Sequence, residues 1–289
     1  MTTTVTLTGT GVPHPAPGRA GAGVLVRHGD VALQFDAGRA TTLRLAEAGV
    51  PPHALTALFV THVHSDHLTG LPDVALTRWV MQQLHRTGPL RVVAAEGVAA
   101  RFVERMLEPY DDDIHVRREH TGAPSPQVDL VAFPVPDAPT VVWSSDDRAV
   151  RVTAMQVRHE PVPEAVAYRV DTPDGSVVIS GDTRVCGEVE ALCAGADVLV
   201  HEACRAEAMA ASIAGTVFER IFDYHADSVQ LGAMAQRAAV PHLVLTHLIP
   251  QPATVDDEAR FEADIRRGGY TGRVSVGRDL LTVELGNPD

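Results

Sequence analysis

Apolar residues in the N-terminal part of the chain follow the periods of strands and of one helix. Residues 5–8 alternate between apolar and polar side chains, and after a glycine-bearing turn the apolar runs 23–26 and 31–35 flank a His-Gly-Asp turn. This pattern predicts a strand followed by a hairpin. Apolar positions at helical spacing over 41–49 predict a helix, and the run 57–60 predicts a short buried strand.

The second half of the chain repeats this order of elements with little identity of residues. The predicted strands are 152–157, 165–170, 177–179, 197–200, 243–245 and 281–285, with one more around Val274, and the predicted helices are 188–193, 228–239 and 256–267. Two similar halves of strands and helices indicate a layered α/β fold. The Pro- and Ser-rich segment 123–147 is interpreted as a loop or hairpin within a single domain, 1–289, because candidate metal ligands lie on both sides of it.

Composition restricts the class of protein. Hydrophobic residues make up 45% of the 289 residues and charged residues 21%, which is ordinary for a globular chain with a buried core. No apolar run approaches the roughly 18 residues needed to cross a bilayer, and the first residues alternate like a strand instead of forming a cationic secretion signal. The three cysteines lack metal-binding spacing, so packing is their expected role. We therefore expect a cytoplasmic protein with no membrane contact.

Charge argues against one class of partner. The formal net charge of −13 repels polyanions over the Debye length, about 10 Å at 0.1 M salt, so extended nucleic-acid binding is not expected. A small-molecule ester, including a phosphate ester, stays compatible with this charge because bound dications dominate the field at a metal site.

Four apolar runs end directly at residues that bind metals or transfer protons. The run 58–60 precedes His62, 177–179 precedes Asp182, 198–200 precedes His201 and Glu202, and 243–245 precedes His247. Ligands of open α/β sheets gather beyond the strand ends. The pattern therefore predicts that these side chains meet at one site.

The densest of these clusters is Thr61-His62-Val63-His64-Ser65-Asp66-His67. On an extended segment His62 and His64 point the same way, so both imidazoles can converge on one ion. If the chain bends after Ser65, Asp66 and His67 diverge and can hold a second ion about 3.5 to 4 Å away. Imidazole and carboxylate ligands suit zinc, with manganese or iron as alternatives. The competing interpretation is a polar surface loop.

These residues form the His-x-His-x-Asp-His signature, and the chain resembles the metallo-β-lactamase superfamily. Within it the chain is similar to the ribonuclease Z branch, including its phosphodiesterase and arylsulfatase-like relatives. The similarity runs over the segments 7–11, 61–73, 181–183, 201–203 and 245–247. It implies a four-layer αββα sandwich, and family relatives are commonly homodimers, so a homodimer is expected.

The resemblance implies that His159, Asp182 and His247 complete the metal shell, with Asp182 bridging two Zn²⁺ ions. Each residue also has an ordinary alternative: His159 on the surface, Asp182 as a helix cap and His247 as a core histidine. Asp36 lies near the site in such folds and is interpreted as a structural turn residue.

The resemblance also places Glu202 and His225 beside the metals, where an imidazole oriented by a carboxylate could protonate a leaving oxygen. The family usually follows this histidine with Ser-Thr or Ser-Ser, whereas Ala226 and Asp227 stand here, and Asp227 or Ser228 is expected to cap the next helix. The alternative for His225 is a solvent-exposed residue before that helix. His201 is interpreted as a buried histidine behind the site.

The expected reaction is ester hydrolysis by a metal-bound hydroxide. Two ions bind one water and lower its pKa toward about 7, Asp66 orients or deprotonates that water, and His225 serves the leaving group. The basic arm of ribonuclease Z, inserted between the third-motif histidine and the bridging aspartate, is missing, because His159 and Asp182 are only 23 residues apart. We therefore expect a small phosphodiester, such as a cyclic nucleotide, as substrate.

Three other functions stay open from the sequence. They are an arylsulfatase-like hydrolase, a lactonase or β-lactamase, and a non-catalytic metal-binding protein. Segment 210–224 carries Ile213, Phe218, Ile221, Phe222 and Tyr224, and it is either an apolar lid over the metals or an ordinary amphipathic helix, with a dimer face as a further role.

Overall fold

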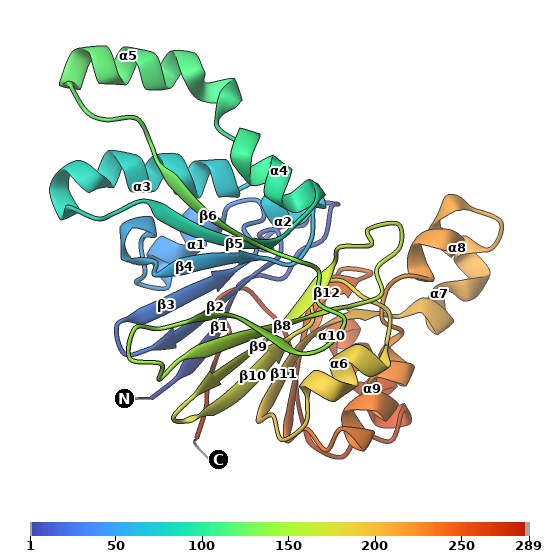
Figure 1. Cartoon of the computed structure of the whole chain (residues 1–289). Coiled ribbons are helices and arrows are strands. Elements are labelled where there is room, and N and C mark those ends of the chain that lie inside the picture. Colours follow the sequence, from blue (N-terminus) through green and yellow to red (C-terminus); the bar gives the residue numbers. More distant parts are fainter. Residues whose placement is uncertain (1, 287–289) are drawn as a thin grey trace.

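Two seven-stranded sheets form the centre of the computed structural model, which describes residues 2–286 (Figure 1). The strand order in the first sheet is β14 (Thr282–Glu284), β1 (Thr4–Gly9), β2 (Gly23–His28), β3 (Val31–Phe35), β4 (Ala57–Val60), β5 (Leu90–Ala95) and β6 (Val128–Phe133). The order in the second sheet is β13 (Arg273–Val276), β12 (His242–Ile249), β11 (Val198–Cys204), β10 (Gly175–Ile179), β9 (Val166–Thr172), β8 (Arg151–Gln156) and β7 (Thr140–Ser144). Each sheet has an antiparallel part and a parallel part, as expected for two similar halves.

Helices cover the outer face of each sheet (Figure 1). Beside the first sheet lie α1 (Thr41–Glu47), η1 (Pro52–Ala54), α2 (Ser65–Leu68), α3 (Leu71–His85), α4 (Val98–Arg105) and η2 (Glu108–Tyr110), and α5 (Asp111–Thr121) projects away from it. Beside the second lie α6 (Gly187–Leu192), α9 (Ser228–Arg237) and α10 (Val255–Arg267), and α7 (Ala206–Ile213) and α8 (Val217–Phe222) project to one side. Leu45 and Val74 pack under the first sheet, and Met234 and Phe261 under the second, which confirms the four-layer αββα sandwich. Among residues 2–286, none of these helices combines the length and apolar character needed to cross a membrane.

The two sheets share one apolar core. Phe35 and Phe59 from the first sheet stack with ring centroids 4.8 Å apart, and Tyr168 from the second sheet lies 5.4 and 5.5 Å from them. The buried Tyr168 hydroxyl donates a hydrogen bond to the Val60 carbonyl across the interface. This packing holds the end of β4, where the first histidines follow, against the second sheet.

The segment 123–147 differs from its prediction as a loop or hairpin. It contains β6, which pairs with β5 in the first sheet, and β7, which pairs with β8 in the second. The two strands are not partners, so the segment carries the chain from one sheet to the other. Both are edge strands with half-exposed side chains, which explains why their apolar pattern is weak.

Candidate metal centre

The predicted ligands come from strand ends of both sheets and lie together. His62 and His64 follow β4, His159 follows β8, Asp182 follows β10 and His247 lies in β12. Their ligand atoms form two groups with all atoms within 4.8 Å of one another, namely His62, His64, His159 and Asp182, and Asp66, His67 and His247. A further group within the same limit contains Asp182, His225 and His247.

Local backbone geometry separates the two groups. His64 is extended (φ −60°, ψ 144°) and α2 begins at Ser65, so the chain bends where the alternation of His62 and His64 ends. On the opposite sheet the pairing of β11 with β12 passes from Glu202 opposite Thr246 to Ala203 opposite Leu248. His247 is the unpaired residue of this bulge, with φ +43°, and its side chain leaves the pleat toward Asp66.

Burial lowers the pKa of the three histidines of the first group and favours their neutral form. The Nδ1 of His159 lies 3.3 Å from the Tyr224 carbonyl, which can only accept, so its Nε2 carries a free lone pair. That Nε2 is 3.1 Å from the Nδ1 of His64. The Nε2 of His62 is buried without a hydrogen-bond partner, 3.9 Å from an Asp182 oxygen. Burial, followed by the charge of His67, holds the pKa of His62 well below its usual range, which keeps this imidazole neutral.

The second group is rich in carboxylates. The Nε2 of His247 lies 3.1 Å from Asp66 Oδ2 and 3.4 Å from Asp182 Oδ2. The Nε2 of His67 lies 3.3 Å from Asp182 Oδ1, so both oxygens of Asp182 contact this group, and Oδ2 also faces His62 of the first. Burial opposes a charge on His67, but Asp182, Asp66 and Asp36 outweigh it and raise the pKa of His67 well above its usual range. This excess of buried negative charge calls for a cation.

Asp36 and Thr61 set the tautomers of two histidines. Asp36 Oδ2 accepts hydrogen bonds from His67 Nδ1 and from the Thr61 hydroxyl, both at 2.7 Å. Since the hydroxyl proton goes to Asp36, the Nδ1 of His62 donates to the hydroxyl oxygen at 3.0 Å. Each imidazole therefore donates from Nδ1 and turns its Nε2 toward the centre. Asp36 was interpreted only as a turn residue; it follows β3 at φ +56° and also orients these ligands.

Glu202 and His225 form a buried pair beside these groups. The Nδ1 of His225 lies 3.0 and 2.9 Å from the two Glu202 oxygens, and Glu202 also accepts from the Thr183 amide at 2.7 Å. Burial lowers the pKa of His225, but the Glu202 carboxylate outweighs it, so the pKa rises to about 9. His225 is buried, contrary to the solvent-exposed alternative. Asp227 caps α9 as expected, and His201 is buried with its Nδ1 donating to the Glu202 carbonyl at 2.8 Å.

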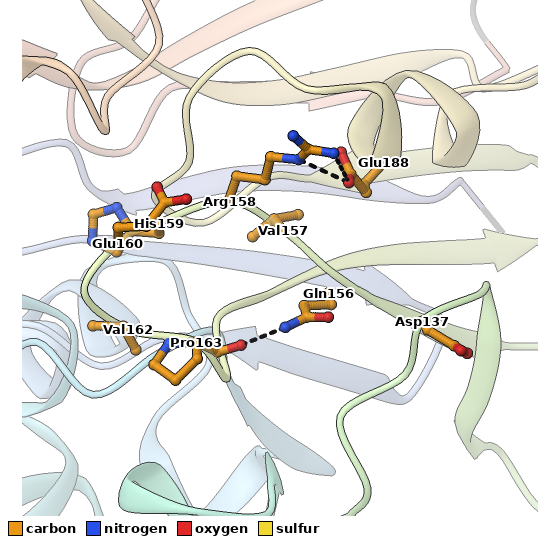
Figure 2. A pocket seen from close by; sticks show the side chains of 9 residues that line it. All are labelled: Asp137, Gln156, Val157, Arg158, His159, Glu160, Val162, Pro163 and Glu188. Carbon is orange, nitrogen blue, oxygen red and sulfur yellow. Dashed lines mark hydrogen bonds and ion pairs between the residues drawn. The ribbon is translucent and has the colours of Figure 1, made fainter.

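Two cavities flank the centre. One, of about 330 Å³, opens over Asp66, Asp182, His225 and His247 and is walled by apolar side chains. The other, of about 480 Å³, lies beside His159 and is shown in Figure 2. Only the first of these cavities is lined by candidate ligands of both groups.

Comparisons with known proteins agree with this fold and site. A family model described as beta-lactamase superfamily domain matches residues 34–248. A ribonuclease Z of Mycobacterium sp. (strain KMS) is 37% identical over 271 residues, covering 92% of this chain and 90% of that protein. The metallo-beta-lactamase fold protein YhfI from Bacillus subtilis superposes with a TM-score of 0.74 at 21% identity, over 98% of this chain and 100% of that one. The short form of human tRNase Z gives 0.66 at 21% identity, over 98% and 99%.

These relatives correct one expectation. The net charge of −13 led us to expect no extended nucleic-acid partner, and that expectation was wrong, because proteins named ribonuclease Z match nearly the full length of this chain. Net charge averages over the whole surface, whereas a nucleic acid contacts one face and, at a metal site, meets the field of the bound cations. Divalent cations fit the histidine and aspartate groups. The chain belongs to the metallo-β-lactamase superfamily of metal-dependent hydrolases, in its ribonuclease Z-like branch.

Proposed function

We propose that this chain is a two-zinc phosphodiesterase that cleaves RNA. One observation carries the proposal: two ligand groups, with Asp182 of the first 3.3 Å from His67 and 3.4 Å from His247 of the second, lie next to a buried Glu202–His225 pair. The identity of 37% to a ribonuclease Z supports RNA as the substrate class. We further propose that residues 1–289 form one domain, which the core shared by the two sheets supports. A homodimer and a cytoplasmic location stay predictions.

The residues present suit two zinc ions. His62, His64, His159 and Asp182 would hold one ion, and Asp66, His67, His247 and Asp182 the other. The donors are imidazole nitrogens and carboxylate oxygens, and the buried Nε2 of His62 has no hydrogen-bond partner among residues 2–286. When bound, such ions polarise a phosphoryl oxygen and lower the pKa of a water molecule.

The chain's own side chains would handle the protons of the reaction. Glu202 holds the Nδ1 proton of His225, so the Nε2 of His225 is the nitrogen left for the substrate. With a pKa near 9, His225 is protonated at neutral pH and can give the Nε2 proton to the leaving oxygen of the ester. Positioned acid catalysis of this kind contributes about a hundredfold to ten-thousandfold. Asp66 would orient the attacking water by accepting its hydrogen bond.

The test compares ester classes on protein loaded with zinc. Unprocessed transfer RNA, bis-p-nitrophenyl phosphate, p-nitrophenyl sulfate and nitrocefin are assayed with and without a chelator, and bound zinc is counted. We expect chelator-sensitive cleavage of both phosphodiesters, with little turnover of the sulfate or of nitrocefin. A preference for the sulfate or for nitrocefin would assign another reaction, and two bound zinc ions with no turnover of any ester would indicate a non-catalytic protein.

A pair of variants ties the activity to the proposed ligands. His62→Ala should lose at least one zinc ion and the phosphodiesterase activity together. His120→Ala removes an exposed imidazole on α5, outside the ligand groups, and should change neither. Full zinc content and activity in His62→Ala would contradict the ligand assignment.

A further inference from the structure

The cavity over the second ligand group has an apolar wall. Its volume is about 330 Å³. The non-polar lining comes from three separate parts of the chain. Val12 and Pro13 lie in the turn after β1, and Ile249 lies at the end of β12. The helix α8 and the segment after it contribute Phe218, Ile221, Phe222 and Tyr224. The charged side chains in its lining are those of the metal centre and His225, apart from His14 at the rim.

The helix α8 leaves its aromatic side chains partly exposed. None of the residues of α8 is buried, and Phe218 is 40% exposed. The rings of Phe218 and Phe222 lie edge to face with centroids 6.3 Å apart, and His14 lies 6.5 Å from Phe218. Figure 1 shows α7 and α8 projecting from one side of the sandwich, so these rings do not serve its core. A group of partly exposed aromatic rings at the mouth of a catalytic centre is typical of a ligand surface.

The second cavity offers the opposite chemistry. Asp137, Glu160 and Glu188 line it, and its one cationic side chain, Arg158, already pairs with Glu188 at 2.9 Å (Figure 2). Its carboxylates repel a phosphodiester chain, and the described residues that line it include no aromatic ring besides the imidazole of His159. The aromatic part of a nucleotide is therefore expected on the α8 side of the centre.

We propose that the 330 Å³ cavity is a nucleobase subsite that holds the base on the leaving-group side of the scissile phosphodiester, an inference that rests on the proposed function. The side follows from His225, which lines this cavity next to Tyr224 with ring centroids 5.2 Å apart. Because His225 gives its proton to the leaving oxygen, the group that departs lies beside these rings. The volume is at the lower end of the range of about 300 to 1,000 Å³ for ligand pockets, so it takes one nucleoside and not a duplex.

Adenosine and ribose are matched probes of this subsite, because they differ by the base alone. On zinc-loaded protein we measure their inhibition constants against methyl p-nitrophenyl phosphate, whose only ring is its leaving group. Adenosine should compete at least tenfold more tightly than ribose. Phe218→Ala should weaken adenosine inhibition about 5- to 150-fold, the factor equivalent to about 1 to 3 kcal/mol for one stacked base. Equal inhibition by adenosine and ribose would overturn the proposal.

Three further variants separate an aromatic subsite from a merely apolar wall. Phe218→Tyr should restore adenosine inhibition, and Phe218→Leu should not. Tyr110→Ala is the matched control, because Tyr110 is 39% exposed, like Phe218 at 40%, and lies on η2 outside the cavity lining. Full recovery with leucine, or an equal effect of the control, would contradict a base-stacking role.

Two outcomes distinguish this inference from its rivals. Sedimentation velocity reports whether Phe218→Ala changes the oligomeric state; a change in assembly without a change in adenosine inhibition would make α8 a contact between two copies of the chain and overturn the subsite. Adenosine binding is also measured directly by calorimetry. If adenosine binding depends on Phe218 but no phosphodiester is turned over, the proposed function is wrong and the base-binding site is retained. If phosphodiesters are turned over but adenosine binding does not depend on Phe218, the subsite is wrong and the proposed function is retained.

Discussion

Replacing Asp36 with asparagine should weaken the binding of both proposed metal ions while leaving the fold intact. Asp36 Oδ2 accepts from His67 Nδ1 and from Thr61 Oγ1, and Thr61 Oγ1 in turn accepts from His62 Nδ1. The asparagine side chain has one oxygen and one NH₂ group, so it cannot accept from every donor that now faces the carboxylate. If the amide nitrogen faces His67, that ring must move its proton to Nε2, the atom proposed to bind an ion.

The size of the effect follows from the two ligands involved. Loss of a hydrogen-bond partner behind a metal ligand typically costs 10- to 100-fold in affinity, or about 1.4 to 2.7 kcal/mol. Because His62 and His67 belong to different groups, each ion should lose about this much. Zinc affinity is measured by competition with a chromophoric chelator, and the fold is checked by circular dichroism.

A second variant makes the reasoning refutable. Thr61→Val removes the hydroxyl under His62 but keeps the Thr61 amide bond to Asp36 Oδ1 and the contact of Asp36 with His67. It should therefore weaken the binding of the ion held by the group of His62 and leave the binding of the ion held by the group of His67 unchanged. Asp146→Asn makes the same chemical change at an exposed residue and should have no effect. If Thr61→Val lowers the affinity for both zinc ions equally, or if the Asp36 variant keeps wild-type affinity, the hydrogen bonds from Asp36 through Thr61 do not control the tautomers.

Two predictions concern stability away from the ligand groups. Burial, followed by the charge of Arg273, lowers the pKa of His242 to about 4, whereas the unfolded chain titrates near 6.5, so the unfolded state takes up the proton first and stability falls as the pH drops from 6.5 toward 4. Between pH 7 and pH 5 the wild-type protein loses unfolding free energy, and His242→Gln should reduce this loss by about 1 to 2 kcal/mol, after allowance for solvent screening. Urea titrations at both pH values measure the loss, and an equal loss in the wild-type protein and the variant would contradict the prediction. Asp227 accepts hydrogen bonds from the amides of Val229 and Gln230 at the start of α9, so Asp227→Ala should lower the unfolding free energy by about 1 kcal/mol, with Asp227→Asn as the control that keeps the cap.

The strand ends that carry the site could be predicted because short apolar runs stop directly at polar residues. The run 57–60 forms β4, the runs 177–179 and 243–245 lie within β10 and β12, and the candidate ligands after them lie together. The pattern of residues 68–122 predicts no element, although α3, β5, α4 and α5 lie there. In α3 a buried arginine interrupts the apolar stripe: Arg78 is 7% exposed and donates to the carbonyls of Pro52, Leu55 and Gly88. Only the folded chain supplies these acceptors, so the pattern alone could not identify the helix.

The same limit applies to the residues that orient the ligands. The His-x-His-x-Asp-His segment names atoms that can bind ions, but a histidine can present either nitrogen, and the choice lies in its second hydrogen bond. For His62 and His67 that bond depends on Asp36, which reaches them because β3 and β4 run parallel with Phe35 opposite Phe59 and the Asp36 amide bonded to the Phe59 carbonyl at 2.7 Å. A slip of β3 by one residue would send Asp36 to the other face of the sheet without altering any ligand. The metal site is therefore set as much by the register of two buried strands as by the histidines that identify it.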